Sequence, residues 1–323
     1  MIITGRKQSQ EIIERIKTSN TSLPIFCTGS HWNTESILLA ARNIEQKYGI
    51  RNVPVAVAMT FNYEYMPQAQ RITWTRDARL GFLSNMKHLK VLADDITSPY
   101  YGLHVLPHLD HADPVRDQWA LTEGTGYLAS VMFDAQKYPL KDNLNLTTDY
   151  VRNYRNKVLI EGIMDELSVF QAHEKHAMGI SVDDYPERAY DYMKKTGVDF
   201  LVADLGTEQQ SQGVGKNVYL KDRACNIRKL IGDRVLVLHG TSCLSDEEIR
   251  QLPGDGILRV NMWTRIARET GLYAIEQLKK REEKIRTNDF ESIESHRYLM
   301  DSIEKAASIM EGIMESLGYG NLK

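Results

Sequence analysis

The 323-residue sequence predicts an α/β fold in which eight parallel strands close into a (β/α)8 TIM barrel, followed by C-terminal helices. Short apolar runs alternate with amphipathic helical patterns along the chain, and this alternation is typical of a parallel sheet. Eight such runs are present, which is the number that closes a barrel. The first run is followed by Thr28-Gly29-Ser30-His31-Trp32-Asn33 and not by a glycine-rich fingerprint. A doubly wound open sheet is therefore the less favoured alternative.

The expected strands are short, apolar and separated by helical periodicity. They cover residues 24–27, 53–60, 104–106, 130–133, 157–161, 200–204, 234–238 and 257–260. The helical patterns cover residues 2–18, 34–47, 78–94, 113–122, 145–156, 186–196 and 245–251. With 42% hydrophobic residues the chain can bury one large core. We expect residues 1–323 to form a single barrel domain, with residues 287–323 as a C-terminal helical extension.

The C-terminal part differs from the rest because it predicts two long charged helices, at residues 264–286 and 295–317. The second carries an apolar stripe formed by Ile303, Ala307, Met310, Ile313, Met314 and Leu317. Such a stripe has to be covered, either by the helices of the same barrel or by a second subunit. We expect a homo-oligomer, a dimer or a tetramer.

Composition excludes several function classes. The net charge of −3, with both signs interspersed, argues against a nucleic-acid partner. No window approaches the roughly 18 uninterrupted apolar residues of a membrane span, and the N-terminus has no signal-peptide core. Cys27, Cys225 and Cys243 are widely spaced, which argues against a disulfide framework. These features favour a cytoplasmic enzyme that acts on a small molecule.

Polar residues gather where the strands end, and in a TIM barrel this end carries the chemistry. The third strand leads into Pro107-His108-Leu109-Asp110-His111, and the seventh leads into His239. Carboxylates follow the fourth, fifth and sixth strands. Two histidines from different strands together with carboxylates are typical of a metal site. Tyr63, Glu64 and Tyr65, after the second strand, are further candidates for the rim of the site.

These strand ends resemble the class II, metal-dependent ketose-phosphate (fructose-bisphosphate) aldolases. The resemblance runs in order from about residue 23 to the C-terminus. It rests on His108-Leu109-Asp110-His111, residues 126–134, Asn143 with Thr147, Pro186-Glu187, residues 196–199, Gly206-Thr207, Leu238-His239-Gly240 and Val260-Asn261. Each motif alone is weak, but all of them in register are specific. The chain resembles a divergent member of this family.

The resemblance implies reversible aldol cleavage of a ketose phosphate or a related anionic sugar through an enediolate that a divalent metal ion, normally Zn²⁺, stabilises. By position, His111 and His239 match metal ligands, and Asp110 matches the catalytic acid/base. Asp134 matches a residue that supports the metal ligands, and we count it among the residues of the substrate site. Asn261 matches a substrate contact, and we expect His108 either to contact the substrate or to support the site residues from behind.

The ligand set departs from the family pattern at two positions. Gln209 stands where the family has a histidine ligand, and Ile163 stands where it has a carboxylate ligand. Glu166 or Asp165 is expected to replace that carboxylate through a local shift. An amide oxygen is a poor zinc ligand, so Mn²⁺ or Mg²⁺ is the alternative metal.

The expected substrate contacts also depart from the family. Gly240, Ser242, Trp263 and Thr264 stand where the family grips the phosphate, but the glycine-rich turn and the aspartate of that grip are absent. Glu174 falls in a loop where the family carries a catalytic glutamate. Two other functions stay open at this point: a ketose or uronate epimerase that uses the same enediolate, and a non-catalytic sugar-binding subunit.

Overall fold

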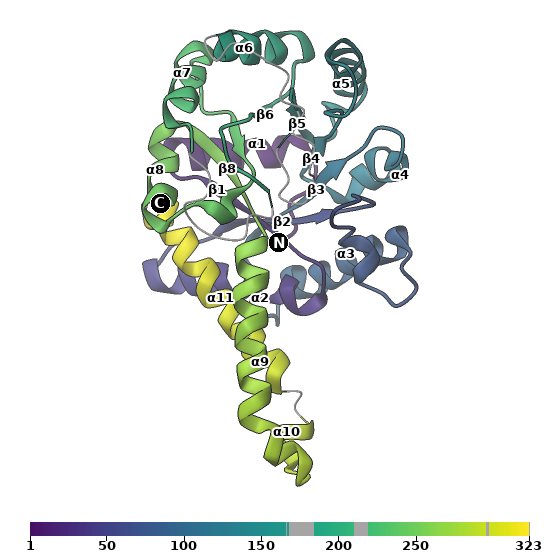
Figure 1. The fold of residues 1–323 in the computed structure, drawn as a ribbon, viewed down its shortest axis with the longest axis vertical. Coiled ribbons are helices and arrows are strands. Elements are labelled where there is room, and N and C mark those ends of the chain that lie inside the picture. The colour runs from purple at the N-terminus through teal and green to yellow at the C-terminus, as the bar shows by residue number, and fades with distance from the viewer. Residues whose placement is uncertain (166, 168–183, 210–218, 295–296, 323) are drawn as a thin grey trace.

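The computed structural model describes residues 1–165, 167, 184–209, 219–294 and 297–322. In these residues eight strands form one closed barrel in the order β1 to β8 (Figure 1). Each strand pairs in parallel with the next, and β8 pairs with β1. The predicted (β/α)8 barrel with C-terminal helices is therefore confirmed.

The strands are β1 Leu23–Cys27, β2 Pro54–Thr60, β3 His104–Ala112, β4 Ser130–Phe133, β5 Leu159–Ile163, β6 Phe200–Val202, β7 Leu236–Leu238 and β8 Ile257–Met262. The helices are α1 Arg6–Thr18, α2 His31–Tyr48, α3 Ala78–Asp94, α4 Gln118–Leu121, α5 Leu140–Tyr154, α6 Tyr185–Thr196, α7 Lys221–Ile231, α8 Asp246–Asp255, α9 Thr264–Arg286, α10 Phe290–Glu294 and α11 Arg297–Ser316.

Several expected boundaries are wrong; the helix expected at 145–156 begins at Leu140, and the helix expected at 245–251 extends to Asp255. Three other differences have a clear local reason. The first helix begins at Arg6 because Ile2 pairs with Val105 beside β3 and Gly5 has a φ of +79°. The third strand extends beyond residue 106 to Ala112, since β2 pairs with it as far as Asp110 and Phe133 of β4 pairs with Ala112. Only Gln118–Leu121 of the expected helix 113–122 is helical. In its first part the carboxylates of Asp113 and Asp117 accept hydrogen bonds from backbone N–H groups, which favours turns. Helix α7 was not predicted.

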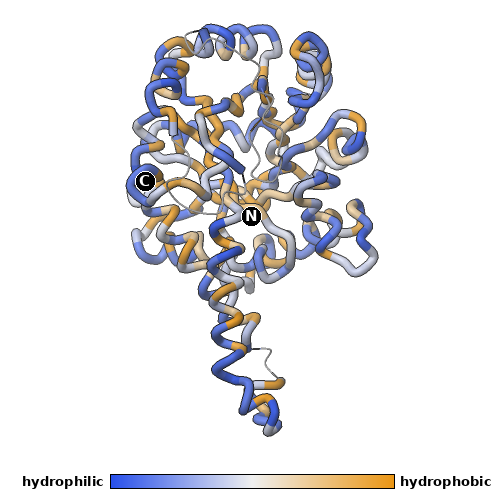
Figure 2. Tube along the Cα trace, in the orientation of Figure 1, coloured by the Kyte–Doolittle hydropathy of each residue, from blue (hydrophilic) through white to orange (hydrophobic). Residues whose placement is uncertain are grey.

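Buried apolar residues of the strands and helices form one core inside and around the barrel. Hydrophobic segments, drawn in orange, lie among the strands of the barrel in the chain trace (Figure 2). A polar layer interrupts this core inside the barrel. Glu161 on β5 and Arg259 on β8 form an ion pair there, and their side chains are at most 1% exposed. Ser130 on β4 accepts a hydrogen bond from Arg259 Nη2 at 3.0 Å and contacts His108 Nδ1 at 2.8 Å. This layer lies beneath the end of the barrel where the polar strand ends meet.

The C-terminal helices form an arm that projects from the barrel, with α9 and α11 side by side and α10 toward the tip (Figure 1). The apolar stripe of α11 is buried, from Ile303 to Leu317, and the helix packs on α2, α8 and β1. The same chain therefore covers this stripe. Other apolar side chains of the arm remain exposed, among them Leu272 and Ile275 on α9 and Phe290 on α10.

Candidate active site

A cavity opens at the carboxyl ends of the strands, and most of the predicted site residues line it. Asp110 and His111 come from β3, His239 follows β7, and Asn261 comes from β8. The other predicted residues on the cavity wall are Gln209, Gly240, Ser242, Trp263 and Thr264. The polar strand ends therefore meet around one space, as parallel strands of a barrel require.

The backbone of β3 turns two successive side chains toward this cavity. A regular strand would place Asp110 and His111 on opposite faces. Between Leu109 and Ala112, however, three steps on β3 match two steps on β4, so β3 carries one extra residue. His111 has a φ of +47°, an uncommon left-handed conformation for a residue other than glycine. Such strain is maintained where surrounding contacts impose it, and it is common at functional sites.

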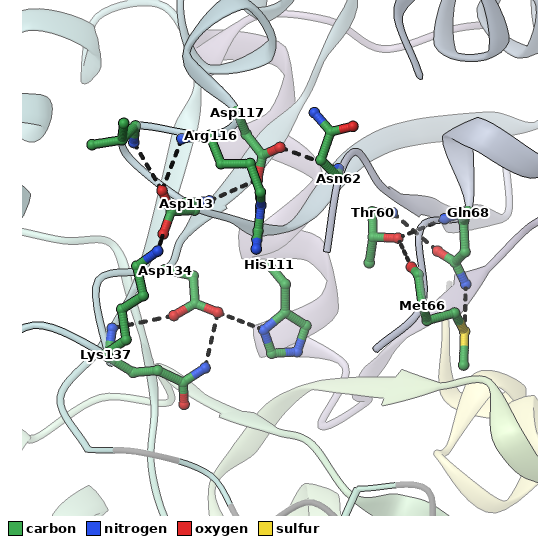
Figure 3. A network of polar contacts seen from close by, with 12 residues as sticks. Thr60, Asn62, Met66, Gln68, His111, Asp113, Arg116, Asp117, Asp134 and Lys137 are labelled. Atoms are coloured by element: carbon green, nitrogen blue, oxygen red, sulfur yellow. Dashed lines mark hydrogen bonds and ion pairs between the residues drawn. The ribbon is translucent and has the colours of Figure 1, made fainter. Parts of the chain in front are cut away.

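Three ligand-type side chains converge in this part of the cavity. One ligand atom each of Asp110, His111 and His239 lies within 4.8 Å of the other two, and all three residues are buried. His111 Nδ1 lies 2.7 Å from Asp134 Oδ2 (Figure 3), and the two histidine rings meet edge to face with centroids 5.0 Å apart. The carboxylate of Asp134 fixes the ring of His111 and leaves Nε2 as its ligand atom.

Electrostatics favour different protonation states for the three residues. Burial lowers the pKa of His239 to about 4, so its imidazole is neutral at pH 7. Its Nε2 is buried and has no hydrogen-bond partner among the described residues. Burial opposes a charge on His111, but Asp110 and Asp134 outweigh burial and raise its pKa. Burial likewise opposes ionisation of Asp110, and the imidazoles of His111 and His239 outweigh it and lower the pKa of the carboxyl.

Asp110 is held on its other side by two neighbours. Asn261 Nδ2 donates to Asp110 Oδ1 at 3.1 Å. The thiol of Cys27, at the end of β1, lies 3.6 Å from Asp110 Oδ2 and 3.2 Å from Asn261 Oδ1. These contacts aim the carboxylate across the cavity mouth toward the two histidines. Asp110 is therefore placed to exchange a proton with a molecule held there.

The turn after His239 depends on a glycine. The backbone carbonyl of His239 accepts a hydrogen bond from Thr207 Oγ1 at 2.6 Å. Gly240 has a φ of +70°, and a Cβ there would lie 2.8 Å from backbone atoms of Glu208. Only glycine permits this close approach of the turns that follow β6 and β7. Ser242 follows in a short 3₁₀ turn, with its Oγ buried and without a hydrogen-bond partner among the described residues.

Some predicted site residues do not line the cavity. His108 lies one layer deeper in the barrel, 3.6 Å from Glu161. Asp134 lies behind His111. Asp165, expected as a possible replacement for the missing carboxylate, pairs instead with Arg188 of α6 at 3.2 Å. Ile163 is fully buried at the end of β5. Glu166 and Glu174 lie outside the described residues.

Other residues of the cavity wall were not predicted to take part in the site. They are Cys27, Thr60, Met66, Gln68, Thr241, Met262 and Ile266. Cys27 and Thr60 end β1 and β2, so their position at strand ends was the available signal. Arg265 lies in the first turn of α9 and forms ion pairs with Asp246 at 2.7 Å and Glu269 at 3.0 Å. Tyr63, which was a rim candidate, also lines the cavity.

Comparison with known families identifies this arrangement. The sequence model of fructose-bisphosphate aldolase class-II matches residues 7–321. The chain belongs to the class II aldolase family. The family resemblance seen in the sequence is thereby confirmed, and family members generally depend on a divalent metal.

The relatives of this class II aldolase family member are distant. Uncharacterized protein YdjI from Escherichia coli is 26% identical over 201 residues, which cover 58% of this chain and 66% of that protein, slightly under two thirds of its length. The crystal structure of a fructose-bisphosphate aldolase from Campylobacter jejuni superposes with a TM-score of 0.72 at 18% identity, over 100% of this chain and 97% of that one. The structure of the YdjI aldolase gives 0.66 at 16% identity, over 98% of each chain. These two likenesses show the shared fold.

Among the described residues, no helix has the length and apolar character needed to cross a membrane.

Proposed function

We propose that this protein is a metal-dependent aldehyde-lyase that catalyses reversible aldol cleavage of a ketose phosphate or a related anionic sugar. The observation that carries the proposal is the buried cluster of Asp110, His111 and His239 at the cavity mouth. Membership of the class II aldolase family supports an aldolase-type lyase, and it implies a small sugar or sugar-phosphate substrate.

The residues present fit a divalent ion. His239 offers a neutral Nε2 that is buried and unpartnered, and His111 offers the nitrogen opposite its bond to Asp134. The side chain of Gln209 lines the same cavity, and its Nε2 is buried without a partner among the described residues. Rotation of its amide by 180° would present Oε1 at that place as a third ligand. A divalent ion held there would polarise the substrate carbonyl and stabilise negative charge on its oxygen. We propose Zn²⁺, with Mn²⁺ or Mg²⁺ as the alternatives that an amide ligand favours.

Asp110 is the proposed acid/base. Its carboxylate is ionised at neutral pH, since the nearby imidazoles lower its pKa, and it can accept the proton of the hydroxyl on the carbon that is cleaved. In the direction of synthesis it returns this proton. Asn261 Nδ2 donates to Asp110 Oδ1, and this bond fixes the orientation of the carboxylate. Glu174 and Glu166 keep their proposed roles as a second catalytic carboxylate and a metal ligand, outside the described residues.

The proposed substrate contacts lie after β7 and β8. Ser242 offers a buried hydroxyl without a partner among the described residues, and Gly240 brings its backbone close to the cavity. Trp263 and Thr264 line the wall where α9 begins, and the Trp263 ring offers an apolar face to a sugar. In the same turn Arg265 is engaged with two carboxylates. We propose that His108 and Asp134 act from behind this wall and do not touch the substrate.

We also propose a cytoplasmic homo-oligomer. Cys27, Cys225 and Cys243 are all free thiols, as in proteins of a reducing compartment. Leu272, Ile275 and Phe290 expose 51–76% of their surfaces along one projecting arm, and such a group of apolar side chains fits a contact with a second copy.

The experiment is metal analysis of protein purified without chelators, followed by incubation with candidate ketose phosphates and detection of a three-carbon product. We expect near one equivalent of divalent metal and a metal-dependent cleavage product. Asp110→Ala should abolish turnover with nearly unchanged metal content, whereas Asp149→Ala, an exposed carboxylate on α5, should behave as wild type. Protein with far less than one equivalent of metal and no product from any ketose would contradict the proposal and favour a non-catalytic role.

A further inference from the structure

An aromatic side chain stacks on one face of the His111 imidazole. The ring of Tyr63 lies parallel to it, with centroids 4.3 Å apart and planes inclined by 7°. Tyr63 is 6% exposed and lines the cavity together with Asp110, His111 and His239. The stack therefore lies at the metal-ligand cluster itself. The mechanism proposed above makes no use of Tyr63.

The loop that carries Tyr63 is anchored on both sides of it. The backbone N–H of Asn62 donates to Asp117 Oδ1 at 3.1 Å, so the loop is tied to the segment that follows β3. Gln68 Oε1 accepts from the N–H of Thr60 at 3.0 Å, and the N–H of Gln68 donates to Thr60 Oγ1 at 2.9 Å (Figure 3). Inside the loop the N–H of Met66 donates to the carbonyl of Tyr63 at 3.1 Å. The ring of Tyr63 is thus part of a closed, hydrogen-bonded loop.

The phenol itself is not the ligand in this arrangement. Tyr63 meets His111 through the face of its ring, because the two ring planes are inclined by only 7°. What Tyr63 contributes at the site is the flat face of its ring.

His111 needs more than one contact to keep its orientation. Its backbone has a positive φ, and such a conformation costs of the order of 1–3 kcal/mol unless the surroundings impose it. The bond from Asp134 to Nδ1 fixes one ring atom, but the ring can still pivot about that contact. A parallel ring at van der Waals distance fixes the plane, and it also excludes water from that face.

We propose that Tyr63 is a positioning residue for the metal site, because its ring holds the imidazole plane of His111 and directs Nε2 toward the ion. The inference rests on the metal-binding part of the proposed function. It assigns no direct contact between Tyr63 and the metal.

The test uses Co²⁺ as the probe, because its visible absorption reports the ligand geometry. Metal-free wild type, Tyr63→Phe, Tyr63→Leu and Tyr63→Met are titrated with Co²⁺, and the Kd is measured by competition with a chelator. Residues that orient a ligand typically contribute 10–100-fold to metal affinity. We expect Tyr63→Phe to match wild type in Kd and spectrum, while the Leu and Met variants bind about 10–100-fold more weakly with an altered spectrum.

Tyr319→Leu is the matched control, since Tyr319 is buried at the far end of the barrel and its hydroxyl donates to the carbonyl of Pro54 at 2.7 Å. This variant should lower the melting temperature and leave Co²⁺ binding unchanged. The Met variant fills the space of the ring, so a folded protein without the stack is available if Tyr63→Leu does not fold.

Unchanged Co²⁺ affinity and spectrum in the Leu and Met variants would overturn the inference, as would an equal loss in Tyr63→Phe. Wild type that binds no Co²⁺ would overturn it together with the metal part of the proposed function. Wild type that binds Co²⁺ but cleaves no ketose would contradict only the aldolase reaction.

Discussion

Replacing Glu161 by Met removes the acidic half of the ion pair inside the barrel, and we expect a large loss of stability. Arg259, its partner, is 1% exposed, and an arginine keeps its charge in proteins. Without Glu161 the guanidinium keeps, among the described residues, the hydroxyl of Ser130 at 3.0 Å and the ring face of Phe200. Breaking one partner of a buried pair costs about 3–5 kcal/mol.

The melting temperature gives the scale of this loss. An unfolding entropy of about 2.1 cal/mol/K per residue gives about 0.7 kcal/mol/K for 323 residues. A cost of about 3–5 kcal/mol then corresponds to a drop of about 4–7 °C. The double variant with Met at 161 and 259 leaves no buried charge in this pair. It should be more stable than Glu161→Met alone, because replacing both members of such a pair is often neutral.

The stability of the converse variant, Arg259→Met, should depend on pH. Burial raises the pKa of Glu161 from 4.5 to about 7, although Arg259 lowers it, so removal of Arg259 moves the pKa above 7. Between the unfolded and folded values the folded state binds more protons, so the free energy of unfolding falls as pH rises, by about 1.4 kcal/mol per unit. This fall extends above pH 7 only in Arg259→Met.

Urea unfolding of the four proteins between pH 6 and pH 8.5, with calorimetry at pH 7, measures both effects. A melting temperature of Glu161→Met within 1 °C of wild type would refute the reasoning, as would a double variant less stable than either single one. Parallel pH profiles for wild type and Arg259→Met would show that Glu161 does not titrate in this range. Circular dichroism checks that every variant keeps the fold.

Two other predictions concern the turn after β7 and the projecting arm. Gly240→Ala should lower the melting temperature and weaken Co²⁺ binding, since its Cβ would lie 2.8 Å from the backbone of Glu208. Gly232→Ala is the control, because Gly232 has a φ of +79° but open space around it. This control should lose only about 1–2 kcal/mol of stability and keep its metal affinity. Leu272→Glu should shift the protein to a smaller oligomer, as measured by light scattering. Ile96→Glu, at an exposed position on the barrel, is the control and should keep the wild-type mass. An unchanged mass of Leu272→Glu would exclude the α9 surface as the subunit contact.

The fold and the polar strand ends could be predicted because both follow from local patterns. Alternating apolar runs define the barrel, and strand ends of a barrel meet at one edge, so topology brings the ends of β3 and β7, with Asp110 and His239, to one place. The bulge in β3 is needed to turn His111 toward the same cavity. The depth of His108 could not be predicted from the same rule. Alternation places it on the face of Asp110, but its contact with Glu161 depends on the stagger of β5 against β3.

The bulge in β3 could not be predicted for a related reason. The extra residue between Leu109 and Ala112 follows from pairing with β4. No residue type in this stretch indicates a positive φ at His111. The helix expected at 113–122 was too long because the side chains of Asp113 and Asp117 accept hydrogen bonds from backbone N–H groups at its start, before α4 begins. The stack of Tyr63 on His111 joins the loop after β2 to the end of β3, so neither segment alone contains the signal.

The site residues that match the family pattern lie on or beside strands, whereas the residue that departs from it at Gln209 lies in a loop. Asp110 and Asn261 lie in the paired parts of β3 and β8, so ladder hydrogen bonds fix their backbone. His111 lies in the bulge of β3, where Asp134 holds its ring, and His239 follows β7 directly, where its carbonyl accepts a hydrogen bond from Thr207. Gln209 lies in the turn that follows β6, beyond the ladder. Ligands on strands keep a precise geometry through sequence change, whereas loop residues can be exchanged at little cost to the fold. If the proposed function holds, the rigid positions set the reaction that the site can perform, and the loop positions set the ion and the sugar that it selects. The exchange at Gln209 should therefore alter metal preference and leave the placement of Asp110 intact.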